Sequence, residues 1–395
     1  MDMDIREILG ISEMYEFIRY LKDIIFDKQR REEYFNKIIE DIDLSTDFIR
    51  DVFQAEAAQR KQMKQDYTPD CICNLFYELS TTPAAVLDEC AGTGSLAISY
   101  IANGVKNVIC IEKSETVFPL LLFNMSIRNV TGWVIKEDIT TRELLEAYRL
   151  EAGTRYSDIA KLEPNIGRAQ TIISNPPYSL PWSGVGDWRF RKYAVPPKSK
   201  GDYLFIIDIL TRLKEGGEAF VLLPHGVLFR GNQELAIRRS LIEKRYIHGI
   251  IGLPDNMFLN TSIPTVMICL KKADTESVYI MDAAKYATKK AKVNELDGEA
   301  VHEIARNYKN RIEKTKTSRL VSIEEIQANQ YNLNIPRYID TTEPEEQVDI
   351  RKLTAQMQET DAEIRKTERE LAGMMRQLVG DGYQNDIAEV LKLWN

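Results

Sequence analysis

Residues 171–178 bring together an unusual set of hydrogen-bond acceptors. The run Thr-Ile-Ile-Ser, typical of a buried strand, leads directly into Asn175, Pro176, Pro177 and Tyr178. Proline has no N–H group, and Pro177 restricts Pro176 to an extended conformation that fixes the direction of its carbonyl. The Asn175 side-chain oxygen and the Pro176 carbonyl can therefore accept the two hydrogens of one amino group. The Tyr178 ring offers a flat face for stacking.

These four residues suit methyl transfer to the exocyclic amine of an aromatic ring. The lone pair of such a nitrogen is delocalised into the ring, so the amine is a poor nucleophile. Two acceptors draw its hydrogens out of the ring plane and direct the lone pair at a methyl group, by orientation and charge stabilisation rather than by a strong base. We therefore expect the catalytic residues to be Asn175, Pro176, Pro177 and Tyr178.

A glycine-containing turn upstream has the form expected of a cofactor site. A short apolar run ends in Asp88, and the turn Ala91-Gly92-Thr93-Gly94-Ser95 then leads into an apolar helical stretch. Glycines at such a bend let the backbone approach a ligand closely. The third glycine of a dinucleotide fingerprint and the Gly-Lys-Ser/Thr of a phosphate loop are both missing. The remaining pattern, D-x-x-x-G-x-G, is the form used for S-adenosylmethionine, a ligand without phosphates.

Two further acids end the next two expected strands. Glu112 closes the run 107–112 and can accept hydrogen bonds from both hydroxyls of a ribose. Asp138 closes the following run and can accept a hydrogen bond from the amino group of an adenine. The carboxyl ends of parallel strands meet at one edge of an open sheet, where ligands bind. Asp88, Glu112 and Asp138 therefore predict a nucleoside-binding edge.

A base within a DNA duplex must leave the helix before its amine can react. Residues 179–200 read as a long loop that interleaves aromatic with cationic side chains: Trp182, Trp188, Arg189, Phe190, Arg191 and Lys192. Such a composition suits an unpaired base and nearby phosphates. We therefore expect this loop to contact nucleic acid while Tyr178 stacks on the reacting base.

The pattern of apolar runs predicts an α/β architecture that would position these residues. Six short runs rich in Val and Ile alternate with helical stretches, which is typical of a largely parallel sheet covered on both faces. The runs are residues 84–89, 107–112, 171–177, 218–224, 247–254 and 265–272. Before them, apolar residues at helical spacing over 13–26 and 34–42 predict a small helical N-terminal domain, residues 1–65.

The C-terminal segment, residues 341–395, carries a different pattern. Apolar residues and two threonines step by three and four, as in a coiled-coil seam of about four heptads. The seam positions are Ile350, Leu353, Met357, Thr360, Ile364, Thr367, Leu371, Met374 and Leu378. The threonines would weaken a homodimeric zipper, so we expect this helix to dock on the helices of a partner.

Charge and cysteine usage limit the function classes. The chain carries a net charge of −8, whereas a protein that holds DNA by itself is usually basic, so we expect a partner to contribute DNA affinity. Five scattered cysteines and three histidines favour reduced thiols in a cytoplasmic protein and predict no metal site. No apolar stretch suits a membrane span, and the first residues lack the order of a signal peptide.

With these motifs in place, residues 60–340 resemble the modification subunit of type I restriction–modification systems, a family of N6-adenine DNA methyltransferases. "QDYTP" resembles the family's aromatic-Thr-Pro motif, which implies that Tyr67, Thr68 and Pro69 lie against the cofactor. "DECAGTGS" resembles its cofactor loop and "SNPPYSLPW" its catalytic loop, in the family's order. The family's cofactor loop usually reads Cys-Gly-Ser-Gly-Gly. Small residues and both key glycines remain here, so we expect cofactor binding to persist.

The resemblance implies a Rossmann-like, S-adenosylmethionine-dependent methyltransferase domain over residues 66–340, between the helical domain 1–65 and a C-terminal coiled-coil helix in 341–395. That helix would bind a separate specificity subunit. Two modification subunits would flank one specificity subunit on double-stranded DNA, with a restriction subunit as an optional further partner. The implied cofactor-binding residues are Tyr67, Thr68, Pro69, Asp88, Ala91, Gly92, Thr93, Gly94, Ser95, Glu112, Asp138 and Asn175.

Two alternative functions stay open. Asn-Pro-Pro-Tyr also suits a methyltransferase for protein glutamine or for an RNA base, because an amide nitrogen poses the same chemical problem. The C-terminal seam has no obvious role in such an enzyme. The other alternative is a cofactor-binding scaffold that assembles a complex without catalysis, and the intact Asn175 and Tyr178 argue against it.

Overall fold

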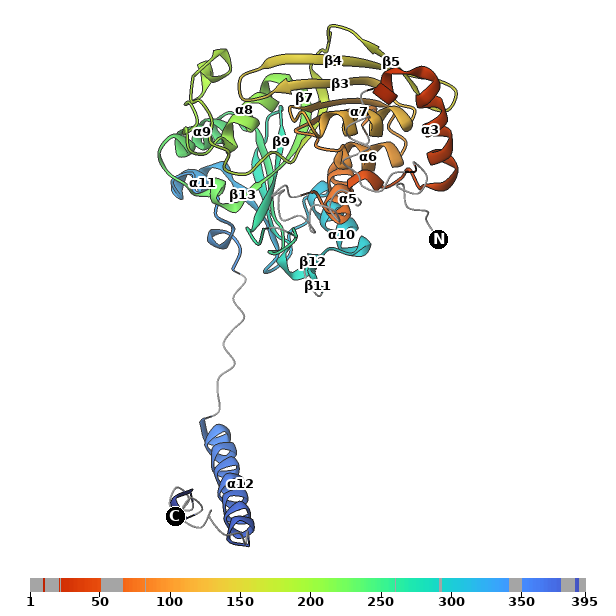
Figure 1. Ribbon diagram of the computed structural model, residues 1–395. Helices are drawn as coiled ribbons and strands as arrows, with labels where there is room; N and C mark the ends of the chain where they lie inside the picture. Colours follow the sequence, from red (N-terminus) through yellow and green to blue (C-terminus); the bar gives the residue numbers. More distant parts are fainter. Residues whose placement is uncertain are drawn as a thin grey trace. The chain divides into compact units, whose positions relative to one another are not determined.

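A computed structural model shows the arrangement of the chain (Figure 1). The structure describes residues 10, 21, 23–50, 67–81, 83–259, 261–290, 293–340, 350–377 and 388–390. As far as it is described, the chain divides into two compact units, Met1–Thr341 and Thr342–Asn395. The first unit contains a large sheet with its helices, and the second contains the long helix α12 (Ile350–Arg376).

Within the described residues, eleven strands form one sheet in the order β13-β10-β8-β9-β7-β6-β1-β2-β3-β4-β5. These strands are β1 (Ala85–Glu89), β2 (Asn107–Glu112), β3 (Thr131–Asp138), β4 (Glu143–Ala152), β5 (Ser157–Lys161), β6 (Ala169–Ser174), β7 (Leu213–Pro224), β8 (Ile247–Gly252), β9 (Thr265–Lys271), β10 (Ser277–Asp282) and β13 (Ser318–Ser322). A separate hairpin pairs β11 (Thr288–Lys289) with β12 (Asn294–Glu295). The six predicted runs correspond to β1, β2, β6, β7, β8 and β9, which confirms the α/β prediction.

Helices cover both faces of the sheet (Figure 1). One face carries α3 (Lys28–Asp41), α5 (Asp70–Leu79), α6 (Ser95–Ala102), α7 (Phe118–Ile127) and α10 (Gly298–Lys309), and the other carries α8 (Asp202–Arg212), α9 (Asn232–Glu243) and α11 (Ile323–Ala328). Short 3-10 turns are η1 (Trp188–Lys192), η2 (His225–Leu228), η3 (Ala284–Tyr286) and η4 (Ile335–Arg337). Successive strand residues point to opposite faces, so Val86 packs in one hydrophobic cluster and Leu87 in the other.

The sheet is parallel in its centre and antiparallel toward both edges. Strands β1, β2, β3, β6 and β7 run parallel to their neighbours in this set. Strand β9 runs antiparallel between β7 and β8, and β4, β5 and β13 are also antiparallel to their neighbours. Strands β8 and β10 are again parallel to each other, so the expectation of a largely parallel sheet is wrong at β9 and at the outer strands β4, β5 and β13. The chain between β8 and β9 contains no helix in its described part, and a parallel crossover usually needs one.

Much of the described N-terminal part is helical, and it packs on the sheet domain. Leu21 and residues 23–26 are helical, and α3 contains most of the predicted helix 34–42. The earlier part of the predicted helix 13–26 lies outside the described residues. The Phe35 ring packs edge-on against Phe123 of α7, with 5.0 Å between ring centres. These residues share one compact unit with the sheet, and the domain boundary at residue 65 stays a prediction.

The C-terminal segment contains the predicted helix. Helix α12 is 27 residues long, and its apolar seam side chains are exposed: Ile350, Leu353, Met357, Ile364, Leu371 and Met374. The last predicted seam position, Leu378, lies outside the described residues. Across the described helices, none combines the length and the hydropathy needed to cross a membrane.

Candidate active site

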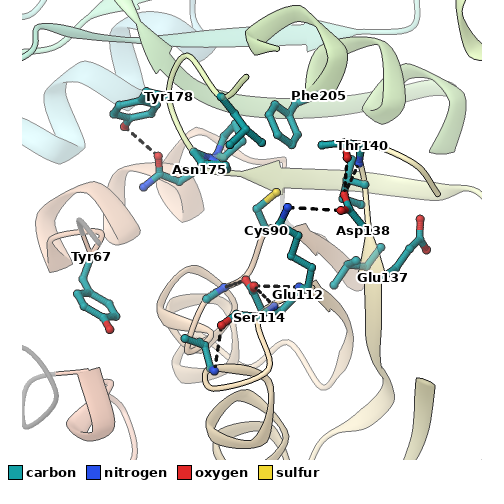
Figure 2. Close-up of a pocket in the computed structure, with 18 of the residues that line it drawn as sticks. Tyr67, Cys90, Glu112, Ser114, Glu137, Asp138, Thr140, Asn175, Tyr178 and Phe205 are labelled. Carbon is teal, nitrogen blue, oxygen red and sulfur yellow. Dashed lines mark hydrogen bonds and ion pairs between the residues drawn. The ribbon is translucent and has the colours of Figure 1, made fainter. Parts of the chain in front are cut away.

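A cavity of about 770 Å³ lies at the carboxyl edge of the parallel strands. Figure 2 shows that the loops after several of these strands contribute its wall. The lining residues are Tyr67, Cys90, Gly92, Ile111, Glu112, Lys113, Ser114, Val117, Glu137, Asp138, Ile139, Thr140, Asn175, Pro176, Pro177, Tyr178, Leu180, Phe205, Thr261 and Ile263. The edge predicted from strand-end residues is thus where the structure has its large cavity.

Asn175 is held in a defined orientation by hydrogen bonds on both sides of its amide. Its Nδ2 donates to the Thr68 hydroxyl at 2.9 Å, and its Oδ1 accepts from the Tyr178 hydroxyl at 2.9 Å. Figure 2 shows Asn175 and Tyr178 side by side on the loop that follows β6. Because the Asn175 nitrogen donates to Thr68, the amide oxygen is the atom that Asn175 presents beside Tyr178. A second lone pair on that oxygen can accept from a substrate.

The loop 175–178 is anchored at both ends. The Ser174 hydroxyl donates to the Glu89 carbonyl at 2.7 Å and ties the end of β6 to β1. The Ser179 N–H donates to Asp202 Oδ1 at 2.7 Å, and Ser179 has a left-handed φ of +50°. Asp202 is fully buried and also pairs with Arg230. Anchors of this kind keep the acceptors of the loop in place before a substrate arrives.

The wall around Tyr178 contains aromatic and apolar residues that the sequence analysis missed. The Phe258 ring meets the Tyr178 ring edge-on, with 6.3 Å between ring centres. Phe205 from α8, together with Thr261 and Ile263, lines the same cavity. The last two lie in the loop that follows β8, which points toward the same edge as β7. Applying the strand-end rule to this loop would have found them.

Glu112 connects the end of β2 to the glycine turn. Its Oε2 accepts the Gly92 N–H at 2.9 Å, and its Oε1 accepts the N–H groups of Lys113 at 2.9 Å and Ser114 at 2.8 Å. Figure 2 shows this carboxylate at the edge of the cavity. These backbone donors fix its rotamer, and its remaining lone pairs are available to a ligand.

Asp138 is the second carboxylate of the cavity. Its Oδ1 accepts the Thr140 N–H at 2.8 Å and the Thr140 hydroxyl at 2.7 Å, and the Lys113 ammonium lies 3.4 Å from Oδ2. Burial by itself would raise the pKa of Asp138, but the Thr140 hydrogen bonds and the Lys113 charge outweigh it, so the pKa is lowered. The group is therefore an ionised acceptor at neutral pH.

The structure brings part of the predicted residue set to the cavity. Tyr67, Gly92, Glu112, Asp138 and the whole Asn-Pro-Pro-Tyr loop line it. The other predicted cofactor residues are not in the described lining: Thr68, Pro69, Asp88, Ala91, Thr93, Gly94 and Ser95. Burial, with the nearby charges of Asp47 and Glu112, raises the pKa of the Tyr67 phenol. Direct contact between each residue and a cofactor stays a prediction.

Asp88 lies beneath the turn rather than in the cavity wall. It is fully buried, and its Oδ2 accepts the Ala97 N–H at 3.3 Å. Its Oδ1 has no hydrogen-bond partner among the residues that the structure describes. Burial, and secondarily the charge of Glu112, raises the pKa of Asp88 well above the ordinary value. Contact with the start of α6 gives Asp88 a role in supporting the turn.

The two glycines of the turn have left-handed backbones that favour glycine. Gly92 has a φ of +57°, and a Cβ atom there would meet nothing within 4 Å. Gly94 has a φ of +97°, and a Cβ at this position would lie 2.6 Å from Met125 Cε. Gly92 therefore leaves room in the cavity, while Gly94 permits close packing on α7.

The loop 179–200 differs from the expectation that all its cations face nucleic acid. Arg189 is buried, and its guanidinium pairs with Asp208 at 2.6 Å and donates to the Ile139 carbonyl at 2.7 Å. Phe190 is buried as well. Arg189 therefore anchors the loop to the end of β3, and only exposed members such as Trp188 can meet a large ligand. Arg189 can be buried because it pairs with Asp208, and the spacing of residues in the sequence does not predict this pair.

No group of three or more His, Cys, Asp or Glu side chains in the described part of the chain is arranged to hold a metal ion.

Comparison with known proteins identifies the family of this arrangement. The sequence model of the family described as "N-6 DNA Methylase" matches residues 46–347. A crystal structure of the type I restriction-modification system methyltransferase subunit from Streptococcus thermophilus is similar, with a TM-score of 0.65 and 27% identity, covering 85% of this chain and 79% of that chain. The fold is thus that of methyltransferases of this kind, with a Rossmann-like sheet.

Two curated proteins of the same kind are similar in sequence to this chain. The chain is 25% identical over 315 residues to the type I restriction enzyme MpnII methylase subunit of Mycoplasma pneumoniae, across 74% of this chain and 56% of the relative. It is 26% identical over 356 residues to the MjaVII methylase subunit of Methanocaldococcus jannaschii, across 82% of this chain and 58% of the relative. The match therefore spans little more than half the length of these relatives.

Proposed function

The chain belongs to the N-6 DNA methylase family, and from this premise we propose that it methylates the N6 amine of adenine in double-stranded DNA, with S-adenosylmethionine as methyl donor. The relatives are named methylase subunits of type I restriction enzymes, which supports this substrate and reaction. They lend no support to a protein glutamine methyltransferase, an RNA base methyltransferase or a non-catalytic scaffold. Activity, substrate and partners are all part of the proposal.

The orientation of Asn175 is the observation that carries it. Thr68 fixes the amide so that Oδ1 is presented beside Tyr178, at the edge of the cavity. This oxygen and the Pro176 carbonyl accept the two hydrogens of the adenine amine and direct its lone pair away from the ring. No side chain needs to remove a proton before the transfer, because the extra proton leaves the amine afterwards.

The cavity fits S-adenosylmethionine by the chemistry of its lining. The carboxylates of Glu112 and Asp138 suit the hydroxyl and amino donors of a nucleoside, and Val117 and Ile139 offer apolar surface to its base. Gly92 keeps space open beside Glu112. When bound, S-adenosylmethionine supplies a methyl group activated by a positively charged sulfur. Tyr67, Gly92, Glu112 and Asp138 would hold it.

The reacting adenine must leave the duplex to reach this site. The Tyr178 ring supplies a stacking surface for it, and the edge-on contact with Phe258 fixes the tilt of that ring. The apolar side chains of Leu180, Phe205 and Ile263 exclude water around the base. Such a pocket strengthens the hydrogen bonds to the amine.

The proposal includes a division of labour with other subunits. A specificity subunit binds the exposed seam of α12 and chooses the DNA site, two copies of this chain flank one specificity subunit, and a restriction subunit can join them. The net charge of −8 supports a need for a partner that contributes DNA affinity. The proposal includes a cytoplasmic location, since the chain would act on DNA together with such partners.

The decisive experiment replaces Asn175 by alanine in the chain co-purified with its specificity subunit. We expect Asn175→Ala to bind S-adenosylmethionine within about threefold of wild type and to lose methyl transfer by about a thousandfold. Transfer is measured as labelled methyl groups in duplex DNA, followed by mapping of modified adenines. Asn103→Ala, at an exposed position after α6, serves as the matched control and keeps the wild-type rate. Wild-type activity in Asn175→Ala, or methyl groups in protein alone, would refute the proposal.

A further inference from the structure

A buried carboxylate from the N-terminal part of the chain lies against the glycine turn. Asp47 is 2% exposed, and its Oδ2 accepts hydrogen bonds from the Thr93 and Ser95 hydroxyls, each at 2.6 Å. Its Oδ1 accepts from Asn124 Nδ2 at 2.9 Å and from the Arg50 N–H at 3.1 Å. Asp47 thus bonds to the turn and to α7, although it comes from the segment expected to form a separate domain.

Two polar side chains at the end of α7 join the same network. Asn124 Nδ2 also donates to the Thr93 carbonyl at 2.7 Å, and Arg128 donates to Asn124 Oδ1 at 2.9 Å. Arg128 further donates to the carbonyls of Leu44 at 2.9 Å and Thr46 at 2.6 Å. Asn124 and Arg128 are buried, so these bonds are shielded from water and costly to leave unmade.

The turn is therefore held between two carboxylates. On the cavity side, Glu112 accepts the Gly92 N–H at 2.9 Å. Away from the cavity lining, Asp47 accepts the hydroxyls of Thr93 and Ser95. A backbone with left-handed φ values at Gly92 and Gly94 has many alternative conformations, and fixed partners on both sides select one of them.

We propose that Asp47 is a positioning residue for cofactor binding, and that the N-terminal segment 44–50 is thereby part of the cofactor site. This inference rests on the proposed function, because it concerns the same cavity. Without the carboxylate, the Thr93 and Ser95 hydroxyls and the Arg50 N–H lose this acceptor, and Asn124 keeps only the Thr93 carbonyl. The turn then no longer presents Gly92 in the binding conformation. By reciprocity, the bound cofactor stabilises the docked segment by the same factor by which the docked segment strengthens cofactor binding.

The test measures the dissociation constant of S-adenosylmethionine by calorimetry, on the full chain, well below its melting temperature. We expect Asp47→Ala to raise the constant by about 10- to 100-fold, which corresponds to the loss of one or two buried hydrogen bonds. Thr93→Val removes a partner of the same carboxylate and is expected to raise it by a smaller factor. The double variant Asp47→Ala/Thr93→Val should bind no more weakly than Asp47→Ala, because both changes remove one interaction.

Two further measurements separate positioning from mere stabilisation. Asp43→Asn is the matched control, since Asp43 is exposed and accepts hydrogen bonds from Ser45 of the same turn. It should keep the wild-type dissociation constant even if it melts slightly lower. Hydrogen exchange at residues 44–50 should slow on addition of S-adenosylmethionine to the wild type and should respond less in Thr93→Val.

The outcomes divide cleanly. A folded Asp47→Ala chain that keeps the wild-type dissociation constant overturns the inference. Hydrogen exchange at residues 44–50 that does not change when S-adenosylmethionine is added also overturns it. Both outcomes leave the proposed function intact. A wild-type chain that binds no S-adenosylmethionine overturns the proposed function and the inference with it. If Asp47→Ala fails to fold, the turn-side variant Thr93→Val/Ser95→Ala decides instead, and its unchanged affinity would overturn the inference.

Discussion

The Thr68 hydroxyl sets the direction of the Asn175 amide, to which we assign the catalytic role. It accepts from Asn175 Nδ2 at 2.9 Å, so the oxygen of that amide stays on the side of Tyr178. In Thr68→Val the amide can rotate and present its donors to the substrate amine. We expect kcat to fall about tenfold while the affinity for S-adenosylmethionine stays near wild type. Single-turnover methylation and calorimetry measure the two quantities.

A hydroxyl-bearing variant provides the control for this prediction. Thr68→Ser keeps the acceptor for Asn175 and should therefore keep most of the wild-type kcat. Equal rates for the Val and Ser variants would show that the hydroxyl does not orient the amide. A rise in the cofactor dissociation constant without a change in kcat would instead support the direct cofactor contact implied by the sequence motif.

His248 predicts how stability depends on pH. Burial, followed by the charges of Arg311 and Lys271, lowers the pKa of its imidazole to about 4. Its Nδ1 lies 2.8 Å from the Tyr308 hydroxyl, and Arg311 lies 3.2 Å from its Nε2. Between the ordinary value near 6.5 and pH 4, the unfolded chain takes up a proton that the folded chain refuses. The free energy of unfolding therefore falls as pH drops through this window.

The variant His248→Gln removes this proton uptake. We expect its free energy of unfolding to lose about 2 kcal/mol less than that of wild type between pH 7 and pH 4.5, a figure reduced for partial exposure of the ring. Urea unfolding at four pH values measures both slopes. Parallel slopes for the two proteins would contradict the assignment.

The strands and turns show which parts of the fold and site could be predicted from the sequence. Six strands were predictable because buried strands between helices read as short Val- and Ile-rich runs. The polar residues at the ends of β2 and β6, with Asp138 at the end of β3, placed Glu112, Asn175 and Asp138 at one edge. The direction in which the antiparallel strands pair could not be predicted from the sequence, because it depends on tertiary partners. The same limit applies to Thr93 and Ser95, whose hydroxyls bond to Asp47, 46 and 48 residues earlier in the chain. A local sequence pattern cannot predict a contact between residues that lie so far apart in the sequence.

Helix α12 has an exposed apolar seam along one side. The two threonines of the seam donate their hydroxyls to carbonyls of the helix, Thr360 to Gln356 at 2.9 Å and Thr367 to Glu363 at 3.0 Å. Their methyl groups can then join the apolar seam without an unsatisfied polar atom. The exposed side chains of Leu353 and Met357 would otherwise remain in water. These features suit burial against a partner's helices.

Charges placed on the seam should abolish this docking. We expect Leu353→Glu/Met357→Glu to weaken binding of the specificity subunit by at least about 100-fold, since each carboxylate would be buried without a partner. Ala355→Glu/Ala362→Glu adds the same charge to exposed positions outside the seam and should bind normally. Sedimentation of mixed subunits measures the difference. Equal loss of binding in both pairs would point to net charge rather than to the seam.

The division into two compact units matches the two roles that we propose, methyl transfer and assembly. The cavity, the glycine turn and Asp47 all lie in Met1–Thr341, while the exposed seam lies in Thr342–Asn395. The whole chain has a net charge of −8, so its attraction to DNA phosphates is weak without help. Under the proposed function, assembly with a specificity subunit is the step that would bring the cavity to DNA.

Removal of residues 342–395 tests this division. Because the first unit has its own core on both faces of the sheet, the truncated chain should melt within about 2 °C of the full chain and bind S-adenosylmethionine with the same dissociation constant. It should lose the specificity subunit, and with it methylation of duplex DNA at any salt concentration at which the full complex is active. Calorimetry and methyl incorporation measure these effects. Full methylation by the truncated chain would show that the first unit holds DNA unaided, and a much lower melting temperature would show that the two units stabilise each other.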